Sequence, residues 1–346
     1  MLLGAGCGDD GDGGEDGAGA EGGGGPQPGP PDPLPFAPAE SRDDGALRLT
    51  SSAGTASNQN PCFAPDGSFL VFTRFESGYN AGPAHIWRLD LDGSEPVQLT
   101  AGDYDDVNVP FGCFSAQSGR VVFASDREEA NDFWTVSPEP DAPDLQRLTD
   151  HGELPVWIEP VFSPDAARVA FEQNIDEAEG ELDQRASVWI VDLATGQAER
   201  LTNPDDTLDD RLPSWSPDGA TILFQHRVPP SELWEVFLVP AVGGAAENLS
   251  AKADKSSGSD TDLSWSPDGR WVASSADPDG IVHPNIFLLP LAGGQLVRVT
   301  ASSEHEDGAP CVSPNGLWVA FESHRTADEE SASDIWIARV PEAARP

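Results

Sequence analysis

The phrase Phe162-Ser163-Pro164-Asp165 opens a unit that continues with Val169-Ala170-Phe171, Val188-Trp189 and Leu201-Thr202. This unit recurs six times along the 346-residue chain, at intervals of about 50 residues. Internal repetition at such a period indicates an array built from one small supersecondary unit. Turn residues alternate here with short aliphatic and aromatic segments, which is typical of β-strands.

The first segment of each unit suits a tight turn. Serine, proline, aspartate and glycine in this order fit a type I turn, because proline fixes φ at the second position. The six copies are Ala64-Pro65-Asp66-Gly67, Ser115-Ala116-Gln117-Ser118, Ser163-Pro164-Asp165-Ala166, Ser216-Pro217-Asp218-Gly219, Ser266-Pro267-Asp268-Gly269 and Ser313-Pro314-Asn315-Gly316. The second copy has lost the proline.

Strand signals surround each turn. An aliphatic residue and a phenylalanine follow it with the period of two that is typical of a strand. The next strand carries an aromatic residue in every copy: Trp87, Trp134, Trp189, Trp234, Phe287 and Trp336. With one strand before the turn and one ending in Leu-Thr, each unit has four antiparallel strands. We therefore predict an all-β, six-bladed β-propeller with four-stranded blades.

The two ends of the chain decide how the ring closes. The sixth copy ends after its third strand, near Val340, whereas an unpartnered segment, residues 46–50, precedes the first copy. We expect this N-terminal strand to complete the last blade, since closure removes exposed sheet edges. The propeller is thus predicted to span residues 46–340.

The residues before the propeller have a different character. Residues 8–45 form a Gly/Pro-rich and acidic linker, which we expect to be disordered. Residues 1–7 read as the remnant of a lipoprotein signal, with Cys7 as the lipidated residue; the alternative is a chance cysteine in a glycine-rich tail. No basic region and apolar run precede Cys7, so we expect the true signal peptide to start upstream. This interpretation predicts a periplasmic, outer-membrane or extracellular lipoprotein that contacts the membrane only through its lipid.

The charge balance excludes some partners. The chain has 60 acidic and 19 basic residues, a formal net charge of −41. Such a surface repels phosphate backbones and anionic headgroups, so we predict no nucleic-acid binding. The acidity indicates either a solvated surface or adaptation to a high-salt habitat, where counterions screen self-repulsion.

The repeat resembles that of the TolB-type propeller family. Trp215-Ser216-Pro217-Asp218-Gly219 and the same five residues at 265–269 match its turn, and residues 123–127 and 321–325 resemble its Phe-x-Ser-x-Arg strand end. The resemblance covers residues 46–340. TolB carries an α/β domain before its propeller, whereas a Gly/Pro tail stands at that place here. The resemblance implies a non-enzymatic scaffold of the bacterial cell envelope that binds a protein or ligand, and we expect a monomer with an envelope protein or peptide as partner.

Three cysteines share one register in the inner strands. Cys62, Cys113 and Cys311 align with Val161, Ser214 and Ser264 of the other copies, which indicates small buried residues. Equivalent positions on neighbouring blades point the same way, so we expect three free thiols and no disulfide. A three-cysteine metal or redox site near the axis is the alternative.

No catalytic motif is present. The sequence lacks a Gly-x-Ser-x-Gly elbow, a phosphate loop and histidines at metal-ligand spacing, so we predict a protein that is not an enzyme. Two alternatives stay open: a propeller enzyme similar to metal-dependent polysaccharide lyases, and an orphan regulatory propeller of the prolyl-peptidase type.

The candidate ligand-binding residues lie just before the inner strands, where the loops that enter these strands converge on one mouth of the channel. They are polar or acidic in most copies: Asn58, Asp106, Asn108, Glu159, Asp210, Asp260 and Asp307. Converging carboxylates suit a hard cation such as calcium, a basic peptide or a ligand amine. Alternatively, these side chains order their own loops as Asx turns. No other cofactor is predicted.

Overall fold

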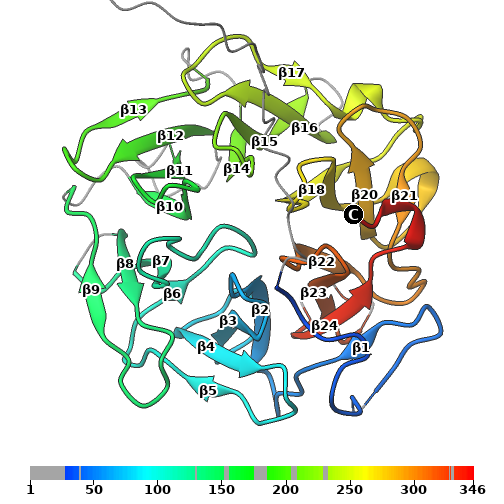
Figure 1. Ribbon diagram of the computed structural model, residues 1–346, viewed down its shortest axis with the longest axis horizontal. Coiled ribbons are helices and arrows are strands. Elements are labelled where there is room, and N and C mark those ends of the chain that lie inside the picture. The colour runs from blue at the N-terminus through cyan, green and yellow to red at the C-terminus, as the bar shows by residue number, and fades with distance from the viewer. Residues whose placement is uncertain are drawn as a thin grey trace, which may run out of the picture.

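The computed structural model describes residues 28–38, 40–128, 131–151, 156–174, 185–203, 209–228, 233–326, 328 and 331–346. Within these residues, 24 strands form six four-stranded antiparallel sheets around a central axis (Figure 1). The predicted six-bladed β-propeller is therefore confirmed. The proposed lipidation site, Cys7, lies outside the described residues.

Each blade begins at the axis and ends at the rim. Blade one has β2 (Ser57–Phe63), β3 (Phe69–Phe75), β4 (Ala84–Asp90) and β5 (Val97–Gln98), and blade two has β6 (Asp106–Val107), β7 (Val121–Ser125), β8 (Asp132–Val136) and β9 (Leu145–Arg147). Blade three has β10 (Trp157–Phe162), β11 (Arg168–Asn174), β12 (Ala186–Asp192) and β13 (Ala198–Arg200). Blade four has β14 (Asp210–Trp215), β15 (Thr221–Val228), β16 (Leu233–Pro240) and β17 (Glu247–Asn248). Blade five has β18 (Asp260–Trp265), β19 (Trp271–Ala276), β20 (Asn285–Pro290) and β21 (Val297–Arg298).

Blade six is formed by strands from both ends of the propeller sequence, as predicted. Its strands β22 (Asp307–Val312), β23 (Trp318–His324) and β24 (Ser333–Arg339) are completed by β1 (Leu47–Arg48). In Figure 1, β1 in blue lies beside β24 in red. Leu47 pairs with Ile337 and Arg48 with Trp336. The closing strand is two residues long. In the rest of segment 46–50, Ala46 is buried and the Thr50 hydroxyl oxygen accepts a hydrogen bond from the Ile335 N–H.

Helical structure in the described residues is limited to three short 3₁₀ turns, η1 (Ser250–Lys252), η2 (Pro278–Gly280) and η3 (Glu342–Ala344). None of these helices has the length and apolar character needed to cross a membrane.

The repeated Leu-Thr has a structural cause that is common to all blades. The hydroxyl oxygen of the threonine, or of Ser250 in blade four, accepts a hydrogen bond of 2.8–3.0 Å from a backbone N–H of the third strand. In the closing blade, Thr50 takes this place and accepts from Ile335. The threonine or serine oxygen accepts a bond that a backbone carbonyl oxygen of the outer strand would otherwise accept, so the short outer strand ends there.

The turn motif is also explained by its hydrogen bonds. In blade four, the Ser216 hydroxyl donates to Asp218 at 2.6 Å and accepts from the Thr221 N–H at 3.0 Å. Gly219 lies at φ 71°, where glycine carries no steric cost. Serine, aspartate and glycine thus form one self-contained turn.

The hydrophobic core is divided into six layers, one between each pair of neighbouring blades. The phenylalanine of the second strand is buried in five blades, at Phe72, Phe123, Phe171, Phe224 and Phe321. Each layer is contributed by two consecutive units, so no blade buries its faces alone.

The expectation of three free thiols was wrong, because Cys62 and Cys113 form a disulfide with a Cα–Cα distance of 6.7 Å. The second blade breaks the repeat: seven positions separate Asp106 from Cys113, whereas four separate Asp210 from Ser214. β6 stops at Val107, but a bridge between Phe114 and Val121 restores the register of the other blades. Cys113 nevertheless lies beside Cys62 in the layer between blades one and two, whereas Val161 and Cys311 lie in the layers that follow their own blades. Among the described cysteines only Cys311 is free, and it is buried.

Part of the predicted linker packs on the propeller. Residues 28–38 and 40–45 belong to the segment that we expected to be disordered, yet Leu34 is buried in the layer between blades six and one. Arg42 forms an ion pair with Asp307 at 2.7 Å. Apolar side chains and this ion pair hold the segment, so the structure differs here from the predicted 8–45 boundary.

Candidate binding site in the central channel

Five of the predicted mouth residues bind basic side chains. Ion pairs or hydrogen bonds join Asp106 to Arg127, Asp210 to His226, Asp260 to Lys255, Asp307 to Arg42 and Asn58 to Arg74. All five predicted residues are buried. In blade two, the contact explains the Phe-x-Ser-x-Arg segment, because Ser125 donates to Asp106 at 2.6 Å and Arg127 pairs with it. These side chains hold their own blades together instead of forming an open acidic ring.

The other two predicted residues have different positions. Asn108 is buried and donates to the carbonyl oxygens of Asn60 and Val109. Glu159 is partly exposed, and its carboxylate lies close to Glu172 and Asp262, which repel it, and to Arg211, which attracts it. Of the seven predicted residues, Glu159 is therefore the one that belongs to the acidic cluster described next.

A bulge at one place in the inner strand directs residues toward the axis. In five blades, the pairing of the inner and second strands shifts register at the same point. The residue at the shift has a φ between 48° and 56°: Asn60, Glu159, Leu212, Asp262 and Ala309. A bulge bends its strand and re-aims side chains, and it is common next to functional sites.

Four carboxylates meet around the channel. Glu159 and Asp262 come from bulges, and Glu172 and Glu322 come from the second strands β11 and β23. Glu159, in blade three, is repelled by Glu172 in its own blade and by Asp262 in blade five. Repulsion between blades that are not neighbours places these groups around the axis. We call these four residues the channel cluster.

Backbone amides and one phenol contact the channel cluster. Glu322 accepts hydrogen bonds of 3.0 Å from the Tyr79 hydroxyl and from the Asn60 N–H. Glu172 accepts a longer bond of 3.4 Å from the Leu212 N–H, and Asp262 one of the same length from Ala309. The positive-φ residue of one blade thus binds a side chain of the blade before it.

The environment favours the protonated form of the cluster. Burial raises the pKa of Glu159 to about 8, with repulsion by Glu172 and Asp262 in addition. Burial likewise raises the pKa of Glu172 to about 7 and of Glu322 to about 8. The pKa of Asp262 is also raised by burial. Near neutral pH the cluster therefore holds protons that an arriving cation would displace.

The opposite end of the channel is apolar. A cavity of about 270 Å³ is lined by residues from all six blades, which lie in the inner strands or just after them, so it lies on the axis. Its aromatic walls include Phe63, Phe114, Phe162, Trp215 and Trp265. The channel thus joins an acidic half to an aromatic half.

No sequence motif pointed to Glu172, Asp262, Glu322 or Tyr79. Glu172 and Glu322 directly follow the phenylalanine of their strands and read as ordinary strand residues. One signal was available: in four blades a proline follows the bulge residue, at Pro61, Pro160, Pro213 and Pro310. Proline marks interruptions of a ladder.

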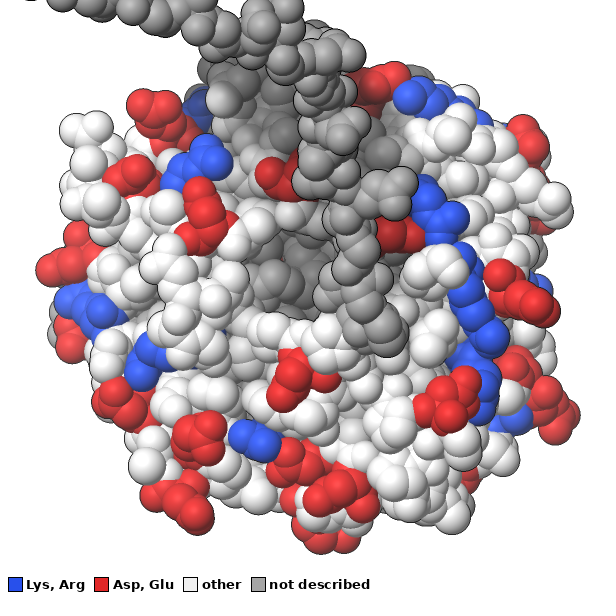
Figure 2. Space-filling view, viewed as in Figure 1, with Lys and Arg blue, Asp and Glu red and all other residues white. Residues whose placement is uncertain are grey.

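Metal binding finds no direct support. In the part of the chain that the structure describes, no group of three or more His, Cys, Asp or Glu side chains is arranged to hold a metal ion. On the face shown in Figure 2, acidic side chains are spread around the whole rim rather than gathered in one patch.

Several solved structures are similar to this chain. TolB from Acinetobacter baumannii is 15% identical over 84% of this chain and 65% of its own, with a TM-score of 0.53. The chain has a TolB-like propeller fold. This chain spans less than two thirds of that TolB. An oligogalacturonate lyase from Vibrio parahaemolyticus is 20% identical over 90% of this chain and 97% of its own, with a TM-score of 0.55.

The TolB-like propeller is shared by proteins with different activities. A puromycin hydrolase is 16% identical over 83% of this chain and 52% of its own, with a TM-score of 0.52. No family model and no curated protein matches the sequence. Identities this low show the fold alone, so function has to be argued from the site.

Proposed function

We propose that this protein is a non-enzymatic binding propeller of the cell envelope whose central channel binds a cationic group of a peptide or protein. The observation that carries the proposal is the channel itself, which combines the channel cluster with an aromatic cavity on the same axis. Carboxylates attract an ammonium or guanidinium group, and aromatic walls accept the apolar part of the same side chain.

The lyase alternative fits this channel less well. The similar lyase acts on oligogalacturonate by its name, and such a polymer carries many negative charges. Any carboxylate of the channel cluster that is ionised repels a polyanion, so this part of the channel disfavours such a substrate. Cleavage of a uronate polymer by the purified protein would support the lyase instead.

The disulfide supports a place outside the cytoplasm. Disulfides persist in oxidising compartments such as the bacterial periplasm, and Cys62–Cys113 is buried between blades one and two. We propose that Cys7 carries the lipid anchor. Labelling with a radioactive fatty acid should mark the protein expressed with its native upstream sequence, and Cys7→Ser should abolish the label; label that persists in the variant refutes the anchor.

Binding can be tested with an acetylated and amidated tripeptide that has a central lysine, against the same peptide with norleucine. Calorimetry at pH 6, 7 and 8 should show that the lysine peptide binds more tightly as the pH rises, because binding displaces protons from the channel cluster. Glu159→Gln with Glu322→Gln should weaken binding at least tenfold. Exposed Glu199→Gln is the matched control. Equal affinity for both peptides, or affinity that does not depend on pH, contradicts the proposal.

A further inference from the structure

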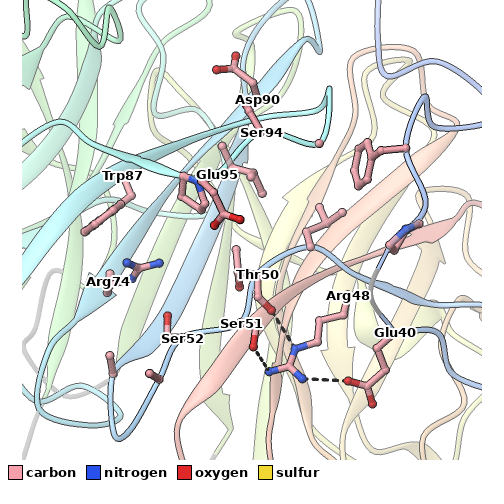
Figure 3. A pocket seen from close by; sticks show the side chains of 18 of the residues that line it. Glu40, Arg48, Thr50, Ser51, Ser52, Arg74, Trp87, Asp90, Ser94 and Glu95 are labelled. Carbon is pink, nitrogen blue, oxygen red and sulfur yellow. Dashed lines mark hydrogen bonds and ion pairs between the residues drawn. The ribbon is translucent and has the colours of Figure 1, made fainter.

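A second hollow lies at the closure of the ring. It is a groove of about 720 Å³ between the segment around β1 and the outer strands of blade one, and it contains none of the channel cluster (Figure 3). Pockets for small ligands have volumes of roughly 300–1,000 Å³. The groove is thus large enough for a ligand of a few residues.

Arg74, on β3, is the unusual residue of this groove. Its Nε donates to the Asn58 side-chain oxygen at 2.8 Å, and its guanidinium lies over the Trp87 ring at 3.9 Å. In the described part of the chain, no acceptor binds its two Nη groups and no carboxylate forms an ion pair with it. Neighbouring Arg48, by contrast, binds Glu40 and Asp334. Burial lowers the pKa of Arg74, and attraction by the Glu76 and Asp334 carboxylates does not reverse this shift.

Two hydroxyl groups add to the donors of the groove. Ser52 accepts a hydrogen bond of 2.8 Å from the Asn58 amide nitrogen, and Ser51 accepts one of 3.4 Å from Arg48. Among the described residues, neither hydroxyl donates its own hydrogen. The single amide group of Asn58 binds both Arg74 and Ser52, which brings their donors close together. The bonds to Asn58 fix the positions of Arg74 and Ser52, and the N–H and O–H groups that these two residues do not use can bind an anionic oxygen.

We propose that this groove binds a short peptide through its C-terminal carboxylate, with Arg74 as the carboxylate-binding residue and Asn58 as a positioning residue. A planar guanidinium with two unused NH2 groups matches a carboxylate in a bidentate geometry. The exposed Glu76 and Glu95 at the rim fit the positive end of a zwitterion and disfavour a polyanion. Phe36 and Leu89 provide an apolar wall for a side chain.

The probe is the tripeptide Gly-Gly-Leu, with its C-terminal amide as the matched ligand. Binding to the full chain is followed by NMR, through the Nε–H signal of Arg74 and the indole N–H signal of Trp87. We expect saturable shifts with the acid and at least tenfold weaker binding of the amide. Arg74→Lys, which keeps the charge but loses the fork, should weaken binding of the acid at least tenfold, and Asn58→Ala should weaken it less.

The control is Arg298→Lys, since Arg298 also lies near an aromatic ring and has no ion pair among the described residues. Thermal melting shows whether each variant is folded, and because Arg74→Lys keeps the cation over Trp87, it serves as the folded variant if Asn58→Ala does not fold. Equal binding of acid and amide, unchanged binding by Arg74→Lys, or no binding at all overturns the proposal. Binding of glucuronate or inorganic phosphate without binding of the peptide also overturns it. The channel probe in the previous section has no free carboxylate, so the two sites are tested separately.

Discussion

Replacing Glu322 with glutamine should change how the stability of the propeller depends on pH. The carboxylate has a pKa of about 8 in the folded protein, against 4.5 as the ordinary value. The folded state thus binds this proton more tightly than the unfolded chain does. Its contribution to stability is complete below pH 4.5 and is lost as the pH rises through about 8.

The magnitude follows from the shift. At about 1.4 kcal/mol per pKa unit, ionising Glu322 costs at most about 5 kcal/mol, and relaxation with entry of water should reduce the cost to about 2–3 kcal/mol. Glutamine cannot ionise, but with its oxygen accepting from the Asn60 N–H its NH2 group faces Tyr79, whose hydroxyl must then accept instead of donate, a change that costs about 1 kcal/mol. Glu322→Gln should therefore be less stable than the natural protein at pH 5 and more stable at pH 9.

Urea unfolding of both proteins between pH 5 and pH 9, at constant ionic strength, measures this difference. Exposed Glu199→Gln is the control, and its stability curve should stay parallel to that of the natural protein. The reasoning is refuted if Glu322→Gln also gives a parallel curve, because Glu322 would then be ionised in the folded state at all these pH values.

Three further predictions concern the ring and its charge. Deleting residues 46–50 removes the strand that closes the ring and should lower the melting temperature of the whole propeller, whereas a truncated protein that melts like the full chain contradicts the closure; calorimetry measures both. Replacing Cys62 and Cys113 with serine should cost about 2–4 kcal/mol in urea unfolding, and the denatured, unreduced protein made without the lipid should show two reactive thiols of its four cysteines, those of Cys7 and Cys311; four thiols would exclude the disulfide. Raising the salt concentration from about 0.1 to about 1 M, which shortens the Debye length from about 10 to about 3 Å, should raise the melting temperature of a chain with net charge −41, and a flat response would rule out adaptation to salt.

The fold was predictable because local and global signals agree in every repeat. The serine of the turn and the threonine after the outer strand each make the same hydrogen bonds from blade to blade, so the sequence repeats where the structure repeats. The pairing of segment 46–50 with the last blade followed from counting strands.

The site was less predictable because it depends on departures from the repeat. Cys113 pairs with Cys62 across the layer between blades one and two, although the register beside it matches that of the other blades, so alignment by register does not reveal the pairing. The bulges at Glu159 and Asp262 break the period of two on which strand prediction rests. Burial raises the pKa values of Glu172 and Glu322, and this burial depends on other segments of the chain, which periodicity does not reveal.

The shared last blade also has a consequence for synthesis on the ribosome. Arg48 is made early, but its partner Trp336 appears 288 residues later, roughly 15–60 s at bacterial or eukaryotic elongation rates. During this interval β1 has no neighbour, and the growing arc exposes an unpaired edge at its newest end. A nascent chain of this protein therefore needs protection from aggregation until translation is almost finished, and a ribosome that stalls before residue 333 releases a product that cannot close.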